Sequence, residues 1–278
     1  MSEANGTDTL LRLDHVTVRF GETVALDRVS LSLRRGETCV IQGSAGSGKT
    51  ILLKTALGLI VPDEGHVYLF GVDTRTARES ELNQLRSRMG ILFQEGGLFD
   101  SMTIEENVGY PLVNMKSLEC PPEEVLERVQ QALDFVELGH TLAKVPSELS
   151  GGMRRRVGIA RAVVTEPALL LYDSPTAGLD PITANTIMVL IAKERDTRGT
   201  ATALATHRYQ DGVLLANYRY NAHTERLEHA GGRDLRTRFV VLGEGRIVFE
   251  GTQEELEASE DPYISKFAKP LKDQPLPE

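Results

Sequence analysis

The chain has 278 residues, with 31 Lys plus Arg against 40 Asp plus Glu and a formal net charge of −9. This length allows one or two domains with a sizeable core. The acidic balance argues against a general nucleic-acid-binding surface, because such a surface needs clustered basic side chains. We therefore expect no nucleic-acid partner, and any phosphate-binding site has to be local.

The sequence shows no sign of export or membrane insertion. The first ten residues are polar and lack a basic start, so we expect no cleaved signal. The apolar runs are shorter than the roughly 18 residues that a membrane-spanning helix needs. The cysteines, Cys39 and Cys120, follow no spacing pattern, which is typical of a reducing compartment and predicts no disulfide.

The N-terminal part of the chain predicts strands followed by a glycine-rich loop and a helix. Alternating apolar and polar residues predict half-buried strands at 11–20 and 25–33. A short buried strand is expected at 38–42, and a helix at 50–59 that ends before Pro62. Strand, glycine loop and helix in this order are typical of an α/β core.

The rest of the chain predicts a helical lobe and a second strand–helix–strand unit. Strand character returns at 64–70, and from Ser80 to Arg161 the composition is helical and polar, which predicts a lobe inserted in the core. Apolar residues at helical spacing predict helices in this lobe at 81–88, 123–136 and 152–164. The second unit comprises a strand, a helix and a strand at 168–173, 181–196 and 202–206. After Pro262 the chain is rich in Pro and Lys, which predicts an irregular arm.

Residues 43–50 read GSAGSGKT, a full match to the phosphate-loop pattern GxxxxGK[ST] in the required strand–loop–helix setting. Glycines let successive backbone N–H groups turn toward the β- and γ-phosphates, and the following helix adds its dipole. Lys49 supplies a cation, and the Thr50 hydroxyl is a ligand for Mg²⁺. The residues predicted to bind nucleotide phosphates are Gly43, Ser44, Ala45, Gly46, Ser47, Gly48, Lys49 and Thr50.

Two further motifs follow the phosphate loop along the chain. Asp173 ends an apolar strand, the place where ligands bind in open α/β sheets, and is expected to bind Mg²⁺. The sequence LSGGM at 149–153 starts a predicted helix. Ser150 is expected to cap this helix, while Gly151 and Gly152 let a phosphate approach its N–H groups.

In this order, the motifs resemble the nucleotide-binding subunit of ATP-binding cassette (ABC) transporters over about residues 11–251. The resemblance implies an α/β fold of the P-loop NTPase (RecA-like) type. It also implies an N-terminal antiparallel β subdomain and an inserted helical subdomain at about 95–165. The expected organisation is one ABC ATPase domain at 1–255 and a C-terminal arm at 256–278.

The resemblance implies roles for residues that, taken singly, would indicate no function. Phe20 takes the place of the ring that stacks on adenine, and Gln94 that of the glutamine that senses Mg²⁺ and water. His207 takes the place of the switch histidine, and residues 177–180 (AGLD) that of a dimer-contact loop. The implied cofactors are ATP and Mg²⁺, and the implied activity is ATP hydrolysis coupled to transport.

The resemblance further implies a dimer, because ATP in this family binds between two cassettes that face head to tail. The phosphate loop of one copy then meets Ser150, Gly151 and Gly152 of the other. A second helix N-terminus neutralises γ-phosphate charge only while ATP is present, so ATP holds the dimer together. The expected partner is a second ABC subunit, most simply another copy of this chain.

The sequence departs from the family at residue 174. The residue after the acidic aspartate is normally Glu, the general base, and here it is Ser174. Removing a positioned base typically costs about 10² to 10⁴ in rate. Three explanations stay open: slow hydrolysis that relies on Lys49, Gln94 and His207, hydrolysis only beside a different subunit, or a chain that holds ATP without turnover.

A second departure is the long stretch between His207 and Gly251. Residues 217–220 and 238–242 have β character and flank a polar, glycine-containing segment, which predicts a β-hairpin extension at about 217–242. This hairpin is either a partner contact or a solvated extension without a function of its own.

Residues 93–112 together with LSGGM resemble the ATPase of MCE or Mla-type phospholipid transport systems. In that family this region lies near the groove that receives a helix of the membrane permease. The apolar residues that either line such a groove or fill the core of the helical lobe are Leu98, Phe99, Met102, Val108, Tyr110 and Leu112. Arg154, Arg155 and Arg156 either contact lipid headgroups or a partner or, as is usual for such a run, lie on a solvated helix face.

The implied partners are an integral membrane permease, an MCE lipid-binding protein and a small regulatory subunit. The implied location is peripheral, on the cytoplasmic face of the bacterial inner membrane. The alternatives are the ATPase of a small-solute ABC importer and a non-hydrolysing, ATP-gated scaffold. A soluble ABC protein that acts on ribosomes or DNA is disfavoured, because such proteins commonly carry two cassettes or long coiled-coil insertions.

Overall fold

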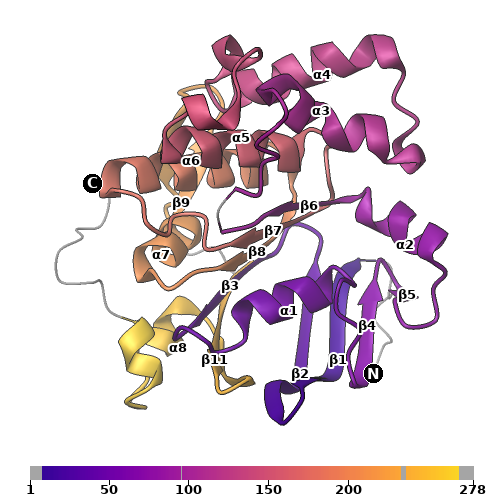
Figure 1. The fold of residues 1–278 in the computed structure, drawn as a ribbon. Helices are drawn as coiled ribbons and strands as arrows, with labels where there is room; N and C mark the ends of the chain where they lie inside the picture. Colours follow the sequence, from indigo (N-terminus) through magenta and orange to yellow (C-terminus); the bar gives the residue numbers. More distant parts are fainter. Residues whose placement is uncertain (1–7, 95, 233–235, 269–278) are drawn as a thin grey trace.

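The computed structural model describes residues 8–94, 96–232 and 236–268, which form two sheets with helices around them (Figure 1). The larger sheet has the strand order β12-β11-β3-β8-β7-β6, and all neighbours are parallel except β12 against β11. Its strands are β3 (Thr38–Gly43), β6 (Met89–Leu92), β7 (Leu169–Asp173), β8 (Ala201–Ala205), β11 (Thr237–Gly243) and β12 (Arg246–Gly251). The carboxyl ends of the parallel strands share one edge, where ligands bind in open α/β sheets.

The smaller sheet is antiparallel, has the order β2-β1-β4-β5 and confirms the predicted N-terminal β subdomain. Its strands are β1 (Thr9–Phe20), β2 (Thr23–Arg34), β4 (Glu64–Leu69) and β5 (Val72–Asp73). Helix α1 (Lys49–Ala56) joins the two sheets, since Leu52 and Leu53 belong to one buried cluster with residues of both. Burying both sheets against α1 fixes the phosphate loop that precedes this helix.

The helical lobe lies on the other side of the larger sheet (Figure 1). A second buried cluster joins this lobe to β6, β7 and β8. Thr103, Ser150 and Asp180 each cap a helix by accepting a backbone N–H of its first turn. The helices after α1 are α2 (Glu79–Arg86), α3 (Ile104–Asn114), α4 (Pro122–Phe135), α5 (Gly151–Val163), α6 (Pro181–Arg198), α7 (Tyr209–Asn217) and α8 (Gln253–Glu257).

Neither cysteine forms a disulfide, as predicted: Cys39 and Cys120 are both free. Cys39 is fully buried in β3, and burial raises the pKa of its thiol to about 11. In the part of the chain that the structure describes, no helix is long and apolar enough to cross a membrane.

The expectation of helical structure throughout 80–161 is wrong at residues 89–92. These residues form β6, the edge strand that pairs with β7. Four residues are too few to show a strand period, so the polar helices on either side dominate the pattern. Helix α7 was also missed, because nearly all of its residues are buried and it has no polar face.

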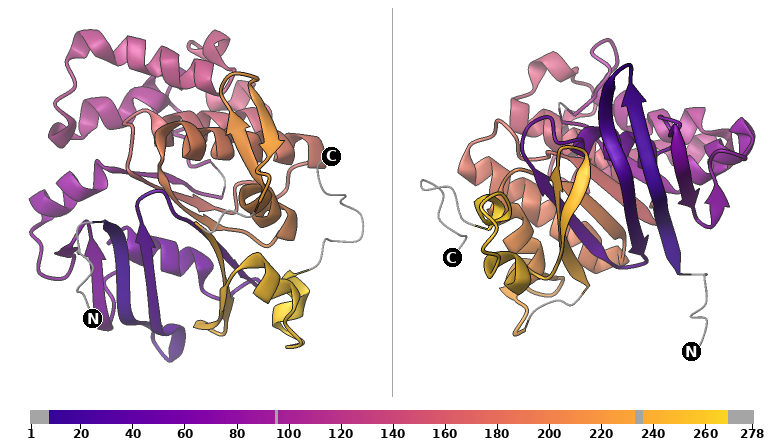
Figure 2. Two further views of the ribbon diagram at one scale, coloured as in Figure 1. Left: turned by 180° about the vertical axis from the view of Figure 1, so that it is seen from behind. Right: turned by 90° about the horizontal axis from the view of Figure 1, so that it is seen from below.

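The predicted hairpin extension is present but shorter than 217–242. Strands β9 (Tyr218–Asn221) and β10 (Arg226–His229) pair as an antiparallel hairpin against α6 (Figure 2, left). The Tyr220 N–H fastens the hairpin by donating to Asp196 of α6 at 2.8 Å. Residues 238–242 belong instead to β11 and pair with β3, which explains their continuous apolar character. Residues 233–235, between the hairpin and β11, lie outside the described residues.

The described part of the C-terminal arm packs on the body rather than forming an irregular extension. The predicted boundary between 255 and 256 falls inside α8. A 3₁₀ helix at Ile264–Phe267 follows, and the buried Ile264 joins a cluster with Tyr209 and Phe239. Residues 269–278 of the predicted arm lie outside the described residues, as do residues 1–7 and residue 95.

Helix α6 carries a buried carboxylate, Glu194, whose raised pKa makes the stability of the fold depend on pH. The Glu194 side chain is 0 % exposed, 3.5 Å from the Arg198 guanidinium, and burial raises its pKa to about 7. Because the pKa is higher in the folded chain, its contribution to stability is present below the unfolded pKa and lost as the pH rises through 7.

We therefore expect Glu194→Gln to flatten the pH dependence of stability. At about pH 8 the variant should gain roughly 1 to 3 kcal/mol in free energy of unfolding over the wild type, and at about pH 4, below the unfolded pKa of 4.5, the difference should nearly vanish. Urea unfolding at both pH values measures this. Glu166→Gln is the matched control, since Glu166 also pairs with Arg198 but its side chain is 70 % exposed. Parallel pH slopes for wild type and Glu194→Gln would contradict the assignment.

Candidate functional site: a nucleotide site at the carboxyl ends of the parallel strands

The loop between β3 and α1 has a conformation that only glycine allows at several positions. Gly43, Gly46 and Gly48 have φ of 153°, 77° and 105°. A Cβ at Gly43 would lie 2.5 Å from the Leu242 carbonyl oxygen, and one at Gly48 would lie 2.7 Å from that of Ala25. Bulkier residues would therefore push the loop off both sheets and close the space for a phosphate.

The side chain of Lys49, the first residue of α1, reaches back into this loop. Its Nζ donates to the carbonyl oxygens of Gly43 and Ser44, both at 2.8 Å, and lies 3.4 Å from Ser47 Oγ. Burial lowers the pKa of Lys49, while the carboxylate of Asp173 opposes that shift. The loop therefore holds a partly desolvated cation, and a phosphate group is the anion that such a nest of N–H groups and ammonium fits.

Thr50 and Asp173 meet at the start of α1, where the Thr50 hydroxyl donates to Asp173 Oδ2 at 2.7 Å. Asp173 is 3 % exposed at the end of β7, with β8 between its strand and β3. A hydroxyl and a carboxylate are hard oxygen donors, and Mg²⁺ is typically held by one or two such protein ligands together with phosphate oxygens and water. The donor set fits Mg²⁺, which when bound would neutralise phosphate charge.

One cavity of about 750 Å³ opens above the loop and collects most of the predicted catalytic residues. Gln94 follows β6, Ser174 follows β7 and His207 follows β8, so three neighbouring strands deliver them to one edge. Asp173 and Ser47 do not line it, and they reach it through Thr50 and Lys49. The residues of the predicted site that line it are Gly43, Ser44, Ala45, Gly46, Gly48, Lys49, Thr50, Gln94, Ser174 and His207.

Ser174 is held in a fixed, left-handed backbone conformation with φ of 50°. Its N–H donates to the Ala205 carbonyl oxygen at 2.8 Å, and its Oγ lies 3.4 Å from Asp173 Oδ1. A serine hydroxyl at this position cannot take a proton from water at neutral pH. Residue 174 therefore lines the cavity at the end of β7 with a hydroxyl and not a carboxylate.

Besides Asp173 and Ser47, four more predicted residues do not line the cavity. Phe20 ends β1 beside the turn to β2, and it is 54 % exposed. Thr23, Val24 and Ala25 line that side of the cavity instead. Ser150, Gly151 and Gly152 start α5, where Ser150 Oγ accepts the Met153 N–H at 3.2 Å. Within the described single chain, the signature residues and the phosphate loop therefore do not share a cavity.

A buried carboxylate that the sequence did not single out supports the catalytic edge. Asp211 Oδ2 accepts from the hydroxyls of Thr176 at 2.6 Å and Thr206 at 2.7 Å. Burial raises the pKa of Asp211, and the hydroxyl donors and Arg208 oppose the shift. Since Thr176 follows Ser174 and Thr206 precedes His207, Asp211 ties together the two loops that carry those residues.

The prediction of a solvated face at 154–156 is wrong. Arg155 is buried and donates to the Ala177 carbonyl oxygen at 3.2 Å. Arg154 and Arg156 donate to the carbonyl oxygens of Leu149 and Val136. These guanidinium groups donate hydrogen bonds to carbonyl oxygens around helix α5, which the signature residues start. Three consecutive arginines in the sequence do not predict such a role.

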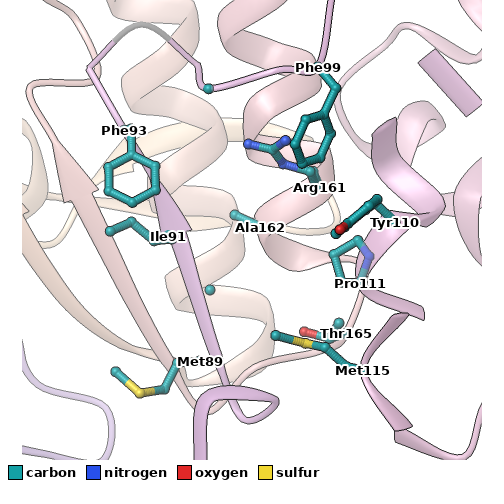
Figure 3. Close-up of a pocket in the computed structure, with 12 residues that line it drawn as sticks. Met89, Ile91, Phe93, Phe99, Tyr110, Pro111, Met115, Arg161, Ala162 and Thr165 are labelled. Atoms are coloured by element: carbon teal, nitrogen blue, oxygen red, sulfur yellow. The ribbon is translucent and has the colours of Figure 1, made fainter. Parts of the chain in front are cut away.

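A second, mainly apolar pocket of about 270 Å³ lies between β6, α3 and α5 (Figure 3). The rings of Phe99 and Tyr110 lie 4.7 Å apart at its rim, and the Arg161 guanidinium lies 5.7 Å from the Phe99 ring. Both rings are more than a third exposed, whereas Val108 and Leu112 are buried in the lobe. Of the six apolar residues expected to line a groove or fill the core, two line the pocket, three belong to or pack against the buried core of the lobe, and Met102 does neither.

The site has the features of a P-loop nucleotide-binding protein: a phosphate loop between strand and helix, and an acidic residue at the end of a strand that one further strand separates from the loop's own strand. The family model described as ABC transporter matches residues 26–177. The chain belongs to this family, and its fold is that of an ABC ATPase cassette.

Relatives of several kinds match nearly the whole chain. It is 31 % identical to the intermembrane phospholipid transport system ATP-binding protein MlaF of Haemophilus influenzae, with 96 % of this chain and 93 % of that protein covered. It is 37 % identical to the methionine import ATP-binding protein MetN of Rhizobium johnstonii, with 90 % and 63 % covered. A solved dimeric cassette, MJ0796 in a post-hydrolysis state with ADP and Pi, has a TM-score of 0.73 and 30 % identity over 87 % of this chain and 98 % of its own.

Proposed function

We propose that this chain is the ATP-binding and slowly hydrolysing subunit of a membrane ABC transporter of phospholipids. The observation that carries the catalytic part is the shared cavity that brings Lys49, Thr50, Gln94 and His207 together over the phosphate loop. The similarity to MlaF proteins over 96 % of the chain supports phospholipid as the cargo. The similarity to MetN keeps a small-solute importer as the second candidate.

The active unit is a head-to-tail homodimer. The absence of Ser150, Gly151 and Gly152 from the cavity of the described single chain supports this arrangement, since the signature then meets ATP on another copy. The nucleotide phosphates bind the loop N–H groups and Lys49, and Phe20, which is exposed at the β1–β2 turn, beyond which Thr23, Val24 and Ala25 line the cavity, is the ring proposed to stack on adenine. Thr50, Gln94 and Asp173 are the residues that would hold Mg²⁺, which would supply charge neutralisation at the phosphates. The signature of the partner copy closes over the γ-phosphate, and Gln94 and His207 orient the attacking water.

The permease is the membrane partner, and its docking site is the apolar pocket between β6, α3 and α5. Phe99 and Tyr110 offer exposed ring surface there, beside the partly buried Arg161. An MCE lipid-binding protein and a small regulatory subunit complete the proposed assembly. The chain then sits peripherally on the cytoplasmic face of the bacterial inner membrane.

We expect Tyr110→Asp to release the chain from its permease, because a carboxylate placed in an apolar docking pocket would be desolvated without a partner. Recovery of the permease with the tagged chain should fall about tenfold or more, with ATP binding unchanged. Val113→Asp is the matched control: it lies on the same helix, is 67 % exposed and does not line the pocket. Equal permease recovery with both variants would overturn the docking assignment.

The cargo is tested on the same material. Mass spectrometry of the purified wild-type complex should detect phospholipid bound at about one or more molecules per complex, well above a detergent-matched control membrane protein. A permease recovered with bound amino acid and no enriched phospholipid would favour the small-solute importer instead.

A further inference from the structure

The C-terminal segment of the chain contacts the phosphate loop directly. The Tyr263 hydroxyl lies 3.2 Å from Ser44 Oγ and accepts the Ser44 N–H at 3.4 Å. The same hydroxyl donates to the Leu242 carbonyl oxygen at 2.8 Å. Residues more than two hundred positions apart in the sequence thus meet at the second residue of the nucleotide site.

The contact links the end of β11 to the phosphate loop, and phosphate binding depends on the positions of both. Leu242 at the end of β11 pairs with Gly43, the first residue of the loop. Ser44 follows, and its carbonyl oxygen accepts from Lys49 Nζ at 2.8 Å. One hydroxyl therefore bridges the strand that flanks the loop and the residue whose carbonyl holds the lysine.

Hydrogen bonds and ring packing hold the segment around Tyr263 in place, so that it can support the phosphate loop. Asp261 Oδ1 accepts the N–H groups of Tyr263 at 2.7 Å and Ile264 at 3.1 Å. The Tyr263 ring packs against Phe267 with centroids 5.2 Å apart, and Phe267 itself lines the nucleotide cavity. A Cβ at Gly243 would lie 3.0 Å from the Tyr263 ring, so glycine at that position makes room for the ring.

We infer that Tyr263 is a positioning residue for ATP binding, whose hydroxyl holds the second residue of the phosphate loop in its binding conformation. It acts through Ser44 and touches no reacting atom. The hydroxyl, rather than the ring, carries the effect, because the oxygen makes the hydrogen bonds to Ser44 and to the Leu242 carbonyl. This inference rests on the proposed ATP-binding function of the loop.

The test is Tyr263→Phe in the full chain, which keeps the ring and removes the hydroxyl. We expect the dissociation constant for ATP with Mg²⁺, measured by calorimetry, to rise about threefold to tenfold, since one hydrogen-bonded bridge is lost. The thermal midpoint should move little, because the ring still packs in its cluster.

The matched control is Tyr209→Phe. Tyr209 lies in the same C-terminal cluster, and its hydroxyl contacts Glu257 and Gln253 of α8. This variant should leave the ATP dissociation constant unchanged while lowering the thermal midpoint. Unchanged or tighter ATP binding by Tyr263→Phe would overturn the inference, and so would equal weakening by Tyr209→Phe, which would point to general loosening of the segment. A wild-type chain that binds no ATP would instead overturn the proposed function on which the inference rests.

Discussion

Replacing Ser174 by Glu should raise the ATPase rate of the assembled complex by at least about tenfold, and a well-positioned general base typically contributes about 10² to 10⁴. Residue 174 already lines the nucleotide cavity together with Gln94 and His207. Its backbone is fixed by the bond to Ala205, so a longer side chain would extend from a defined starting point. The substitution therefore adds a base to a site whose other parts are in place.

The affinity for ATP should not improve in this variant, because a carboxylate added near the γ-phosphate repels the ground-state nucleotide. Steady-state phosphate release gives the rate and calorimetry gives the affinity. Ser174→Gln is the matched control, since it has the length of Glu without a proton acceptor of the same strength. A rate that stays at the wild-type level in Ser174→Glu would show that another group is the base.

Replacing Lys49 by Ala should weaken ATP binding by roughly 10- to 100-fold, the value of charged hydrogen bonds to phosphate, and should abolish ATP-dependent dimerisation. The variant removes the cation and also the donor that holds the Gly43 and Ser44 carbonyl oxygens. The substitution therefore removes the cation that contacts the phosphates and also two hydrogen bonds that stabilise the conformation of the loop.

Lys54→Ala provides the comparison, because Lys54 lies on the same helix but does not line the cavity. Calorimetry with ATP and Mg²⁺ on both variants separates loss of the site from loss of net charge. Wild-type nucleotide affinity in Lys49→Ala would refute the assignment of the phosphate loop.

Local patterns located the phosphate loop and Asp173, which the structure brings together through Thr50, because the features of each lie in consecutive residues. The phosphate loop needs glycines at fixed offsets from Lys49, and Asp173 needs only a buried strand before it. The positions that supply Gln94, Ser174 and His207 were available only through the family resemblance, since single polar residues after strands have no pattern of their own. These residues share one cavity because their strands, β6, β7 and β8, are neighbours in the larger sheet, and this strand order cannot be predicted from local patterns.

The contacts that the sequence did not reveal are those between distant segments. Asp211 and Tyr263 act through hydrogen bonds to residues far along the chain, and no local period marks them. Arg155 reads as part of a basic surface run but is buried against a loop carbonyl. Strand β6 was missed for a related reason, because its identity depends on pairing with β7 rather than on its own four residues.

The most direct test of the central claim, that two copies share each ATP site and that Ser174 slows turnover, is the mass of the full chain in solution with and without ATP and Mg²⁺. Light scattering coupled to gel filtration should show a monomer without nucleotide and a dimer with ATP. The dimer should outlast gel filtration because bound ATP is hydrolysed slowly. A chain that binds ATP and keeps the monomer mass at saturation would contradict the account.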